Sequence, residues 1–235
     1  FVVLDKDRNI VRIIFKQYMI DIAPQIGESL LEDLGQRDFT INSIAFSLDS
    51  RNIIDPFDGI GDLRKSVIRT SNIQNIINDP LRIIRCFRFL SELNFSIDNI
   101  ILDFIKLNKQ KLSNVAVERI QNELKKIIKG NQAFKAVRLI NQIKLFECFQ
   151  YDEKFLYEVI ASVNCKYFNK DEIEKFMPIF YLTELLSESA MKKLKFSKNE
   201  ILKTNLLRYW KNKFRTKPIY EFNEIEIFDL HKDLE

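Results

Sequence analysis

Hydrophobic and polar positions follow two different patterns along this chain, and the change comes near residue 79. Before it, short runs rich in β-branched residues alternate with polar clusters, which is typical of strands and turns. We expect a hairpin in the first 21 residues, with a turn at residues 5–9 between strands at 2–4 and 10–15. A second short strand pair is expected at residues 44–48 and 52–55.

From residue 79 to residue 210, apolar residues recur three and four positions apart with little Gly or Pro, which predicts an almost entirely helical region. Leu81, Ile84 and Leu90 are positions expected to pack inward. The predicted fold class is therefore α+β, with a small α/β part followed by an all-α part. No stretch reaches the roughly 18 apolar residues that a membrane-spanning helix needs, so we expect no membrane partner.

The scarce residue types restrict the chemistry. The single histidine, His231, lies in the last five residues, which argues against a Ser-His-Asp triad and a histidine-rich zinc site. The three cysteines, Cys86, Cys148 and Cys165, show no C-x-x-C spacing. The five glycines form neither G-x-G-x-x-G nor G-x-x-x-x-G-K-[ST]. Any reaction must therefore depend on carboxylates, Arg and Lys.

The net charge is +4, and the excess of basic residues lies in residues 79–130, which hold ten Lys or Arg against six Asp or Glu. A locally basic helical segment suits a polyanion such as RNA or a nucleotide phosphate. A solvated helix face is the alternative explanation, and charge alone favours it.

Residues 78–89 form the most informative segment. Asp79 followed by Pro80 predicts a helix start with Asp79 as the N-cap. Arg82, Arg85 and Arg88 then recur every three residues. A carboxylate beside a guanidinium can read the amino donor and ring acceptor of cytosine or adenine and reject uracil and guanine. Alternatively, the aspartate caps the helix and the arginines bridge to acidic neighbours.

Two further segments are weaker taken alone. Arg37, Asp38 and Asn42 precede an apolar strand and either contact a ribose and a phosphate or cap and turn the backbone. Asp55 and Gly59 belong to a segment with one proline and two glycines, which indicates a turn or a hinge.

The order of the motifs is more specific than any one of them. The chain reads R-D-F-T-I-N at 37–42, I-D-P-F-x-G at 54–59, D-P-L-R-I-x-R-x-x-R-F at 79–89 and V-E-R-I-x-x-E-L at 117–124. This order resembles the class II CCA-adding tRNA nucleotidyltransferase and bacterial poly(A) polymerase family over residues 21 to about 130. Beyond residue 145 the resemblance is only to the family's helical body.

The resemblance implies a division into the C-terminal part of a nucleotidyltransferase head (1–64), a neck with a base-reading helix (65–130) and a helical body that binds tRNA (131–235). It implies that Asp79 and Arg82 serve as the template for the incoming base. The other implied roles are nucleotide contacts for Arg85, Arg88, Arg37, Asp38 and Asn42, a flexible loop for Asp55 and Gly59, and bracing of the neck for Glu118 and Arg119.

The implied activity is addition of C and A from CTP and ATP to the tRNA 3′ end with Mg²⁺, in the cytoplasm or in an organelle. Asp79 and Arg82 accept both bases, so a poly(A) polymerase or a relative that adds only A or only CC remains an alternative. An RNA- or nucleotide-binding module without catalysis is the alternative outside enzymes.

Two departures from the family pattern matter. Asn78 stands where the family usually has Glu, and we expect it to affect helix capping more than specificity. The family's glycine-rich turn and metal-binding Asp-x-Asp are not found, and because the chain begins at Phe1 we expect them upstream. Asp5-Lys6-Asp7 has the spacing but lies in the expected turn. Asp21 is our candidate for a supporting carboxylate, and we expect no metal ligands in this chain.

Overall fold

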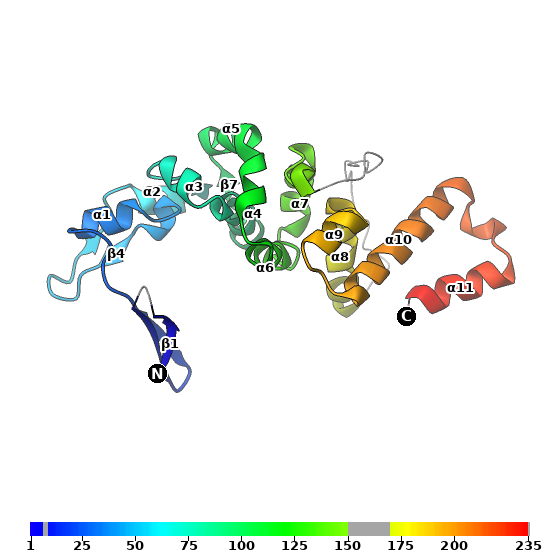
Figure 1. The fold of residues 1–235 in the computed structure, drawn as a ribbon, viewed down its shortest axis with the longest axis horizontal. Coiled ribbons are helices and arrows are strands. Elements are labelled where there is room, and N and C mark those ends of the chain that lie inside the picture. The colour runs from blue at the N-terminus through cyan, green and yellow to red at the C-terminus, as the bar shows by residue number, and fades with distance from the viewer. Residues whose placement is uncertain (7–8, 150–169, 235) are drawn as a thin grey trace. The chain divides into compact units, whose positions relative to one another are not determined.

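The computed structural model describes residues 1–6, 9–149 and 170–234 (Figure 1). These residues form two compact units. The first comprises Phe1–Lys65 and Arg69–Asn75, and the second comprises Ser66–Ile68 and the described residues of Ile76–Glu235. The three-part division expected from the sequence stays a prediction. Cys165, Asp7 and the helical pattern expected at 150–169 lie outside the described residues.

An antiparallel sheet of three strands opens the first unit, so the predicted hairpin is confirmed and a third strand that was not predicted follows it. β1 (Val2–Asp5) pairs with β2 (Ile10–Phe15), which also pairs with β3 (Tyr18–Ile22). Phe15 faces Tyr18 in the register, so the chain reverses through two residues, and the first of them, Lys16, has a φ of 53°. Asp21 lies on this third strand rather than at the end of the second.

The rest of the first unit consists of short elements. Ser29 accepts a hydrogen bond from the Glu32 N–H and so caps α1 (Leu30–Gly35). The predicted second strand pair is confirmed, although it is shorter than expected. The remaining elements are η1 (Thr40–Asn42), β4 (Ala45–Phe46), β5 (Ile53–Ile54) and α2 (Gly59–Lys65). Phe39 is fully buried in this unit.

The second unit is mainly helical, as the apolar spacing predicts. α4 (Leu81–Leu93) packs against α6 (Val117–Ile127) and α7 (Ala133–Gln142). Its predicted inward positions, Leu81, Ile84 and Leu90, are all buried. The other elements of this unit are α5 (Asn99–Asn108), η2 (Lys109–Asn114), η3 (Glu147–Phe149) and the parallel strands β6 (Val67–Ile68) and β7 (Ser96–Ile97), while α3 (Gln74–Asn78) has residues in both units.

Four further helices follow residue 169: α8 (Lys170–Leu185), α9 (Glu188–Lys193), α10 (Lys198–Thr216) and α11 (Glu224–Leu234), with η4 (Ile219–Glu221) before the last (Figure 1). Trp210 of α10 is 1% exposed and its Nε1–H donates to Asp233 at 2.9 Å. None of the described helices has both the length and the hydropathy required to span a membrane.

Candidate nucleotide-binding site

The first group of candidate residues follows α1. Asp33 of α1 accepts from Arg37 at 2.7 Å, and the Arg37 side chain remains 52% exposed. Burial raises the pKa of Asp33, but hydrogen bonds from Arg37 and the Ile26 N–H outweigh it and leave the pKa lowered. Asp38 is buried and accepts from Asn42 Nδ2 at 2.9 Å. The turn thus has a half-exposed guanidinium and, one residue later, an ordered carboxylate–amide pair.

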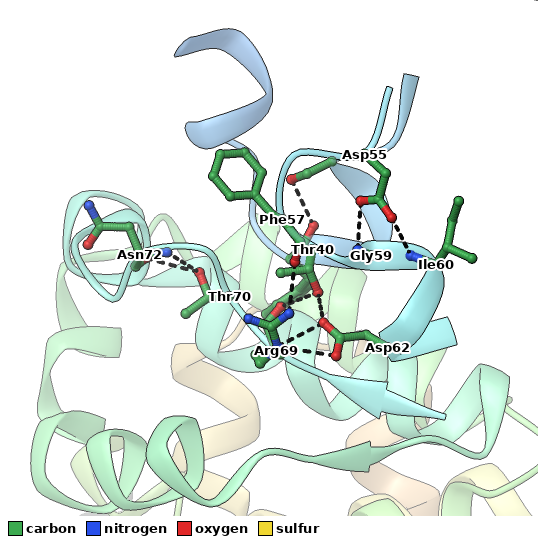
Figure 2. A network of polar contacts seen from close by, with 11 residues as sticks. Thr40, Asp55, Phe57, Gly59, Ile60, Asp62, Arg69, Thr70 and Asn72 are labelled. Atoms are coloured by element: carbon green, nitrogen blue, oxygen red, sulfur yellow. Dashed lines mark hydrogen bonds and ion pairs between the residues drawn. The ribbon is translucent and has the colours of Figure 1, made fainter. Parts of the chain in front are cut away.

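A buried polar network fixes this turn (Figure 2). The Thr40 hydroxyl donates to Asp62 Oδ2 at 2.5 Å, and the Thr40 N–H donates to the Arg69 carbonyl at 2.8 Å. Arg69 Nε lies 2.9 Å from Asp62 Oδ2, and its Nη2 donates to the Phe57 carbonyl at 2.8 Å. Because Asp62 is buried, the Thr40 hydroxyl and Arg69 Nε compensate for the loss of its hydration.

Residues 55–60 form a tightly packed corner beside this network, where the chain turns into α2 (Figure 2). The two Asp55 carboxylate oxygens accept from the backbone N–H groups of Gly59 at 2.7 Å and Ile60 at 2.9 Å, at the start of α2. Gly59 is buried, and a Cβ there would lie 2.2 Å from the Thr40 carbonyl oxygen. Gly59 and Gly61 therefore lie in a helix rather than in the predicted turn, while the hinge role stays a prediction.

In the second unit, Asp79 lies two residues before the first residue of α4. The helix begins at Leu81 with Pro80 in the N-cap position, so the prediction that Asp79 is the N-cap is wrong by one residue. Asp79 Oδ1 still accepts from the Leu81 N–H at 3.3 Å. Its other oxygen, Oδ2, accepts from Arg119 Nη2 of α6 at 3.2 Å. Arg82, the second residue of the helix, is half-buried.

Arg88 points into the contact between α4 and α6. Its side chain is 12% exposed and lies 3.2 Å from Glu123 and 3.6 Å from Glu92. Its guanidinium also lies 4.5 Å from the centre of the Phe89 ring, which Arg85 approaches at 5.8 Å. Arg88 thus bridges to acidic neighbours, which is the alternative reading of this arginine row, and its predicted contact with a nucleotide stays a prediction.

Glu118, next to Arg119 on α6, pairs with Lys195 at 2.5 Å. This hydrogen bond lowers the pKa of Glu118. Gln121 donates to the Lys195 carbonyl at 2.8 Å. Glu118 and Gln121 thus connect α6 to the segment after α9, and Arg119 connects it to Asp79.

Four residues of these networks were missed by the sequence analysis: Asp33, Asp62, Arg69 and Glu123. The four-residue spacing between Asp33 and Arg37 is a helical ion-pair signal that could have found the first. Glu123 lies 35 residues from Arg88 in the chain, and no local pattern joins them.

The described residues do not fit the metal that the resemblance implies. Among residues 1–6, 9–149 and 170–234, no three His, Cys, Asp or Glu side chains gather closely enough to hold an ion. Asp21 accepts from Arg12 Nε at 2.7 Å and from its Nη2 at 2.8 Å. These hydrogen bonds lower the pKa of Asp21. In this structure the partner of Asp21 is an arginine.

Known protein families match both units. Residues 7–69 match the model described as "Poly A polymerase head domain", and residues 94–150 match "Probable RNA and SrmB- binding site of polymerase A". The chain is 39% identical over 123 residues to a CC-adding tRNA nucleotidyltransferase of Synechocystis sp. This aligned segment covers 52% of this chain and 30% of that protein. It is 46% identical over 104 residues to a CCA-adding enzyme of Limosilactobacillus reuteri, covering 43% and 26%.

The fold is shared with solved CCA-adding enzymes. The Bacillus stearothermophilus CCA-adding enzyme in complex with CTP superposes with a TM-score of 0.73 at 23% identity, covering 97% of this chain and 60% of that one. A tRNA nucleotidyltransferase complexed with a primer tRNA and an incoming ATP analog gives 0.65 at 23% identity, covering 98% and 75%.

The matched segments thus span about a third or less of the curated relatives. The predicted α+β class, with part of a nucleotidyltransferase head followed by helices, is confirmed. Together the motifs, the family models and the fold show that the chain belongs to the family of CCA-adding tRNA nucleotidyltransferases and bacterial poly(A) polymerases.

Proposed function

We propose that the protein to which this chain belongs adds C and A from CTP and ATP to the 3′ end of tRNA. The observation that carries the proposal is the carboxylate of Asp79, held by two donors one helical turn before Arg82. The relatives named as CCA-adding and CC-adding enzymes support the same reaction. Because the chain spans only part of their length, the activity is proposed for the whole protein.

The pair acts as a protein template. The Asp79 carboxylate accepts a hydrogen bond from the exocyclic amino group that cytosine and adenine share, and the Arg82 guanidinium donates to the neighbouring ring nitrogen. Uracil and guanine carry a carbonyl where that amino group would be, so two acceptors would face each other and the base is rejected. Both accepted nucleotides therefore satisfy the same two side chains.

The other candidate residues suit the rest of a nucleotide. The exposed guanidinium of Arg37 provides the donors that a phosphate requires. Asp38 and Asn42 already bond to each other, so a ribose hydroxyl would join an ordered pair. Arg85, half-buried on α4, provides a further positive charge. The ion proposed for the reaction is Mg²⁺, as in nucleotidyltransferases generally, and the described residues do not form its ligand set.

A CC-adding enzyme is the second candidate, because three of the similar curated relatives carry that name. Such an enzyme would use the same template for cytosine and leave the terminal A to another protein. Poly(A) addition would require the template to accept adenine repeatedly. Products separate the three, since they end in CCA, in CC or in an A tract.

The test incubates the full-length protein with tRNA lacking its 3′ CCA and with each nucleoside triphosphate separately and together, and then sequences the products. We expect two C and one A. A protein that binds tRNA and adds nothing would be a binding module, and one that adds U or G as readily as C would refute the template.

Arg82→Ala is expected to abolish the preference for CTP and ATP, whereas Lys106→Ala, which removes an exposed ion pair with Asp103 on α5, should preserve it. Unchanged nucleotide preference in Arg82→Ala would refute the role of that arginine.

A further inference from the structure

Asp79 is held from two directions. Leu81 N–H donates to Oδ1 at 3.3 Å from its own helix start, and Arg119 Nη2 donates to Oδ2 at 3.2 Å from α6. The Asp79 side chain nevertheless remains 34% exposed. Each oxygen still has a lone pair for a further donor, because a carboxylate offers about four acceptor positions. The carboxylate is thus oriented and open to a ligand.

The helix that carries Arg119 is itself fixed against α4. Ile120, Leu124 and Ile127 of α6 are fully buried. Glu123, one turn after Arg119, lies 3.2 Å from Arg88, so one ion pair joins α6 to α4 and the Arg119–Asp79 pair joins it to the segment before α4. The Arg88–Glu123 pair is almost fully buried. The Arg119 guanidinium therefore reaches Asp79 from a rigid helix rather than from a loop.

We infer that Arg119 is a positioning residue for nucleotide selection, which acts by holding the Asp79 carboxylate in the orientation that accepts the amino group of cytosine or adenine. The inference rests on the proposed template function and deepens it. The carboxylate of this template discriminates only while its oxygens point at the amino group, since hydrogen bonds weaken steeply when misaligned. A carboxylate that loses Arg119 keeps one backbone donor and can turn about its side-chain bonds.

The experiment uses the full-length protein with tRNA lacking its 3′ CCA, and compares kcat/KM for CTP with kcat/KM for UTP. Arg119→Met is expected to lower this ratio about tenfold, as for one lost charge-assisted hydrogen bond. Because the pair is half-exposed, the thermal midpoint should fall by no more than about 4 °C. Arg119→Lys retains a positive donor and should recover part of the ratio.

A double-mutant cycle separates positioning from a general structural effect. Asp79→Asn should lower the ratio strongly, and adding Arg119→Met to it should lower it no further, because the group that Arg119 orients has already been changed. The matched control is Lys106→Met, which breaks the exposed pair with Asp103 in the same unit and should leave the ratio unchanged.

Two results would overturn the inference while leaving the proposed function intact. One is an equal loss of kcat/KM for CTP and UTP in Arg119→Met, and the other is an effect of Arg119→Met that adds fully to that of Asp79→Asn. If Arg119→Met does not fold, an unchanged ratio in Arg119→Lys together with an unchanged ratio in Arg119→Gln would also refute it. A wild-type protein that adds neither C nor A would overturn both proposals.

Discussion

Gly59→Ala tests whether the corner around α2 is as closed as its contacts indicate. A Cβ at this position would meet the Thr40 carbonyl oxygen at 2.2 Å and Ile44 Cγ1 at 2.8 Å. The first neighbour is backbone and is held by the network of Asp62 and Arg69, so it cannot turn aside. Overpacking of this kind costs about 1–3 kcal/mol.

Alanine recovers part of that cost, since it is better than glycine in a helix by up to about 1 kcal/mol. The net loss is then about 1–2 kcal/mol, which corresponds to a factor of about 5–30 in a local opening equilibrium. The assay is native-state hydrogen exchange of the Thr40 amide, which donates to the Arg69 carbonyl at 2.8 Å and is exposed only when the corner opens.

Gly61→Ala is the matched control two residues along the same helix. Its Cβ would meet the carboxylate of Asp58 at 2.3 Å, but Asp58 is exposed and its side chain can rotate away. We expect exchange of the Thr40 amide to be unchanged or slower in this variant. If Gly59→Ala and Gly61→Ala accelerate exchange equally, or if neither does, the argument from the close approach of Thr40 is wrong.

Three further predictions concern charge. Glu123→Ala leaves Arg88 in the interior with Glu92 as its one remaining acidic partner among the described residues, and we expect urea unfolding to show a loss of about 3 kcal/mol; a loss below about 1 kcal/mol would mean that the buried pair contributes no more than a surface pair. Hydrogen bonds from Lys217, the Asn223 N–H and Lys213 lower the pKa of Glu226 to about 2. The ionised Glu226 therefore stabilises α11 fully above its ordinary pKa of 4.5, and this stabilisation is lost as the pH falls toward 2. Hydrogen exchange of α11 amides should accelerate across that window, and exchange independent of pH after correction for the intrinsic rate would contradict this. Binding of tRNA to the full-length protein should weaken by about tenfold or more between about 50 and 200 mM salt, and a flat dependence would count against phosphate contacts of the basic segment.

The helical part could be predicted because its signal is local. Leu81, Ile84 and Leu90 lie within three turns, and their spacing alone places them on one buried face. The strand Tyr18–Ile22 was missed because the turn before it begins with Lys16 in a left-handed conformation, where glycine or asparagine would have marked the reversal. Strands of two residues, such as Val67–Ile68, are too short to show alternation.

The candidate site was predictable in its residue types and not in its pairings. The Asp-Pro dipeptide at residue 79 marks the helix start to within one residue, because capping and proline geometry are local effects. That Arg119 faces Asp79 and that Glu123 faces Arg88 depends on how α6 packs against α4, across 40 and 35 residues of chain. Such partners become visible only once the helices are placed.

The burial of Trp210 has a practical consequence. It is the only tryptophan in the sequence, and its indole packs edge-on against Tyr209 and near Phe222, with its N–H bonded to Asp233. Intrinsic emission excited at the red edge therefore originates from one place, where α10 meets the C-terminal segment. A thermal unfolding curve recorded from this fluorescence would report the unfolding of the helices at the end of the chain. It would not report the unfolding of the segment with Asp79 and Arg82.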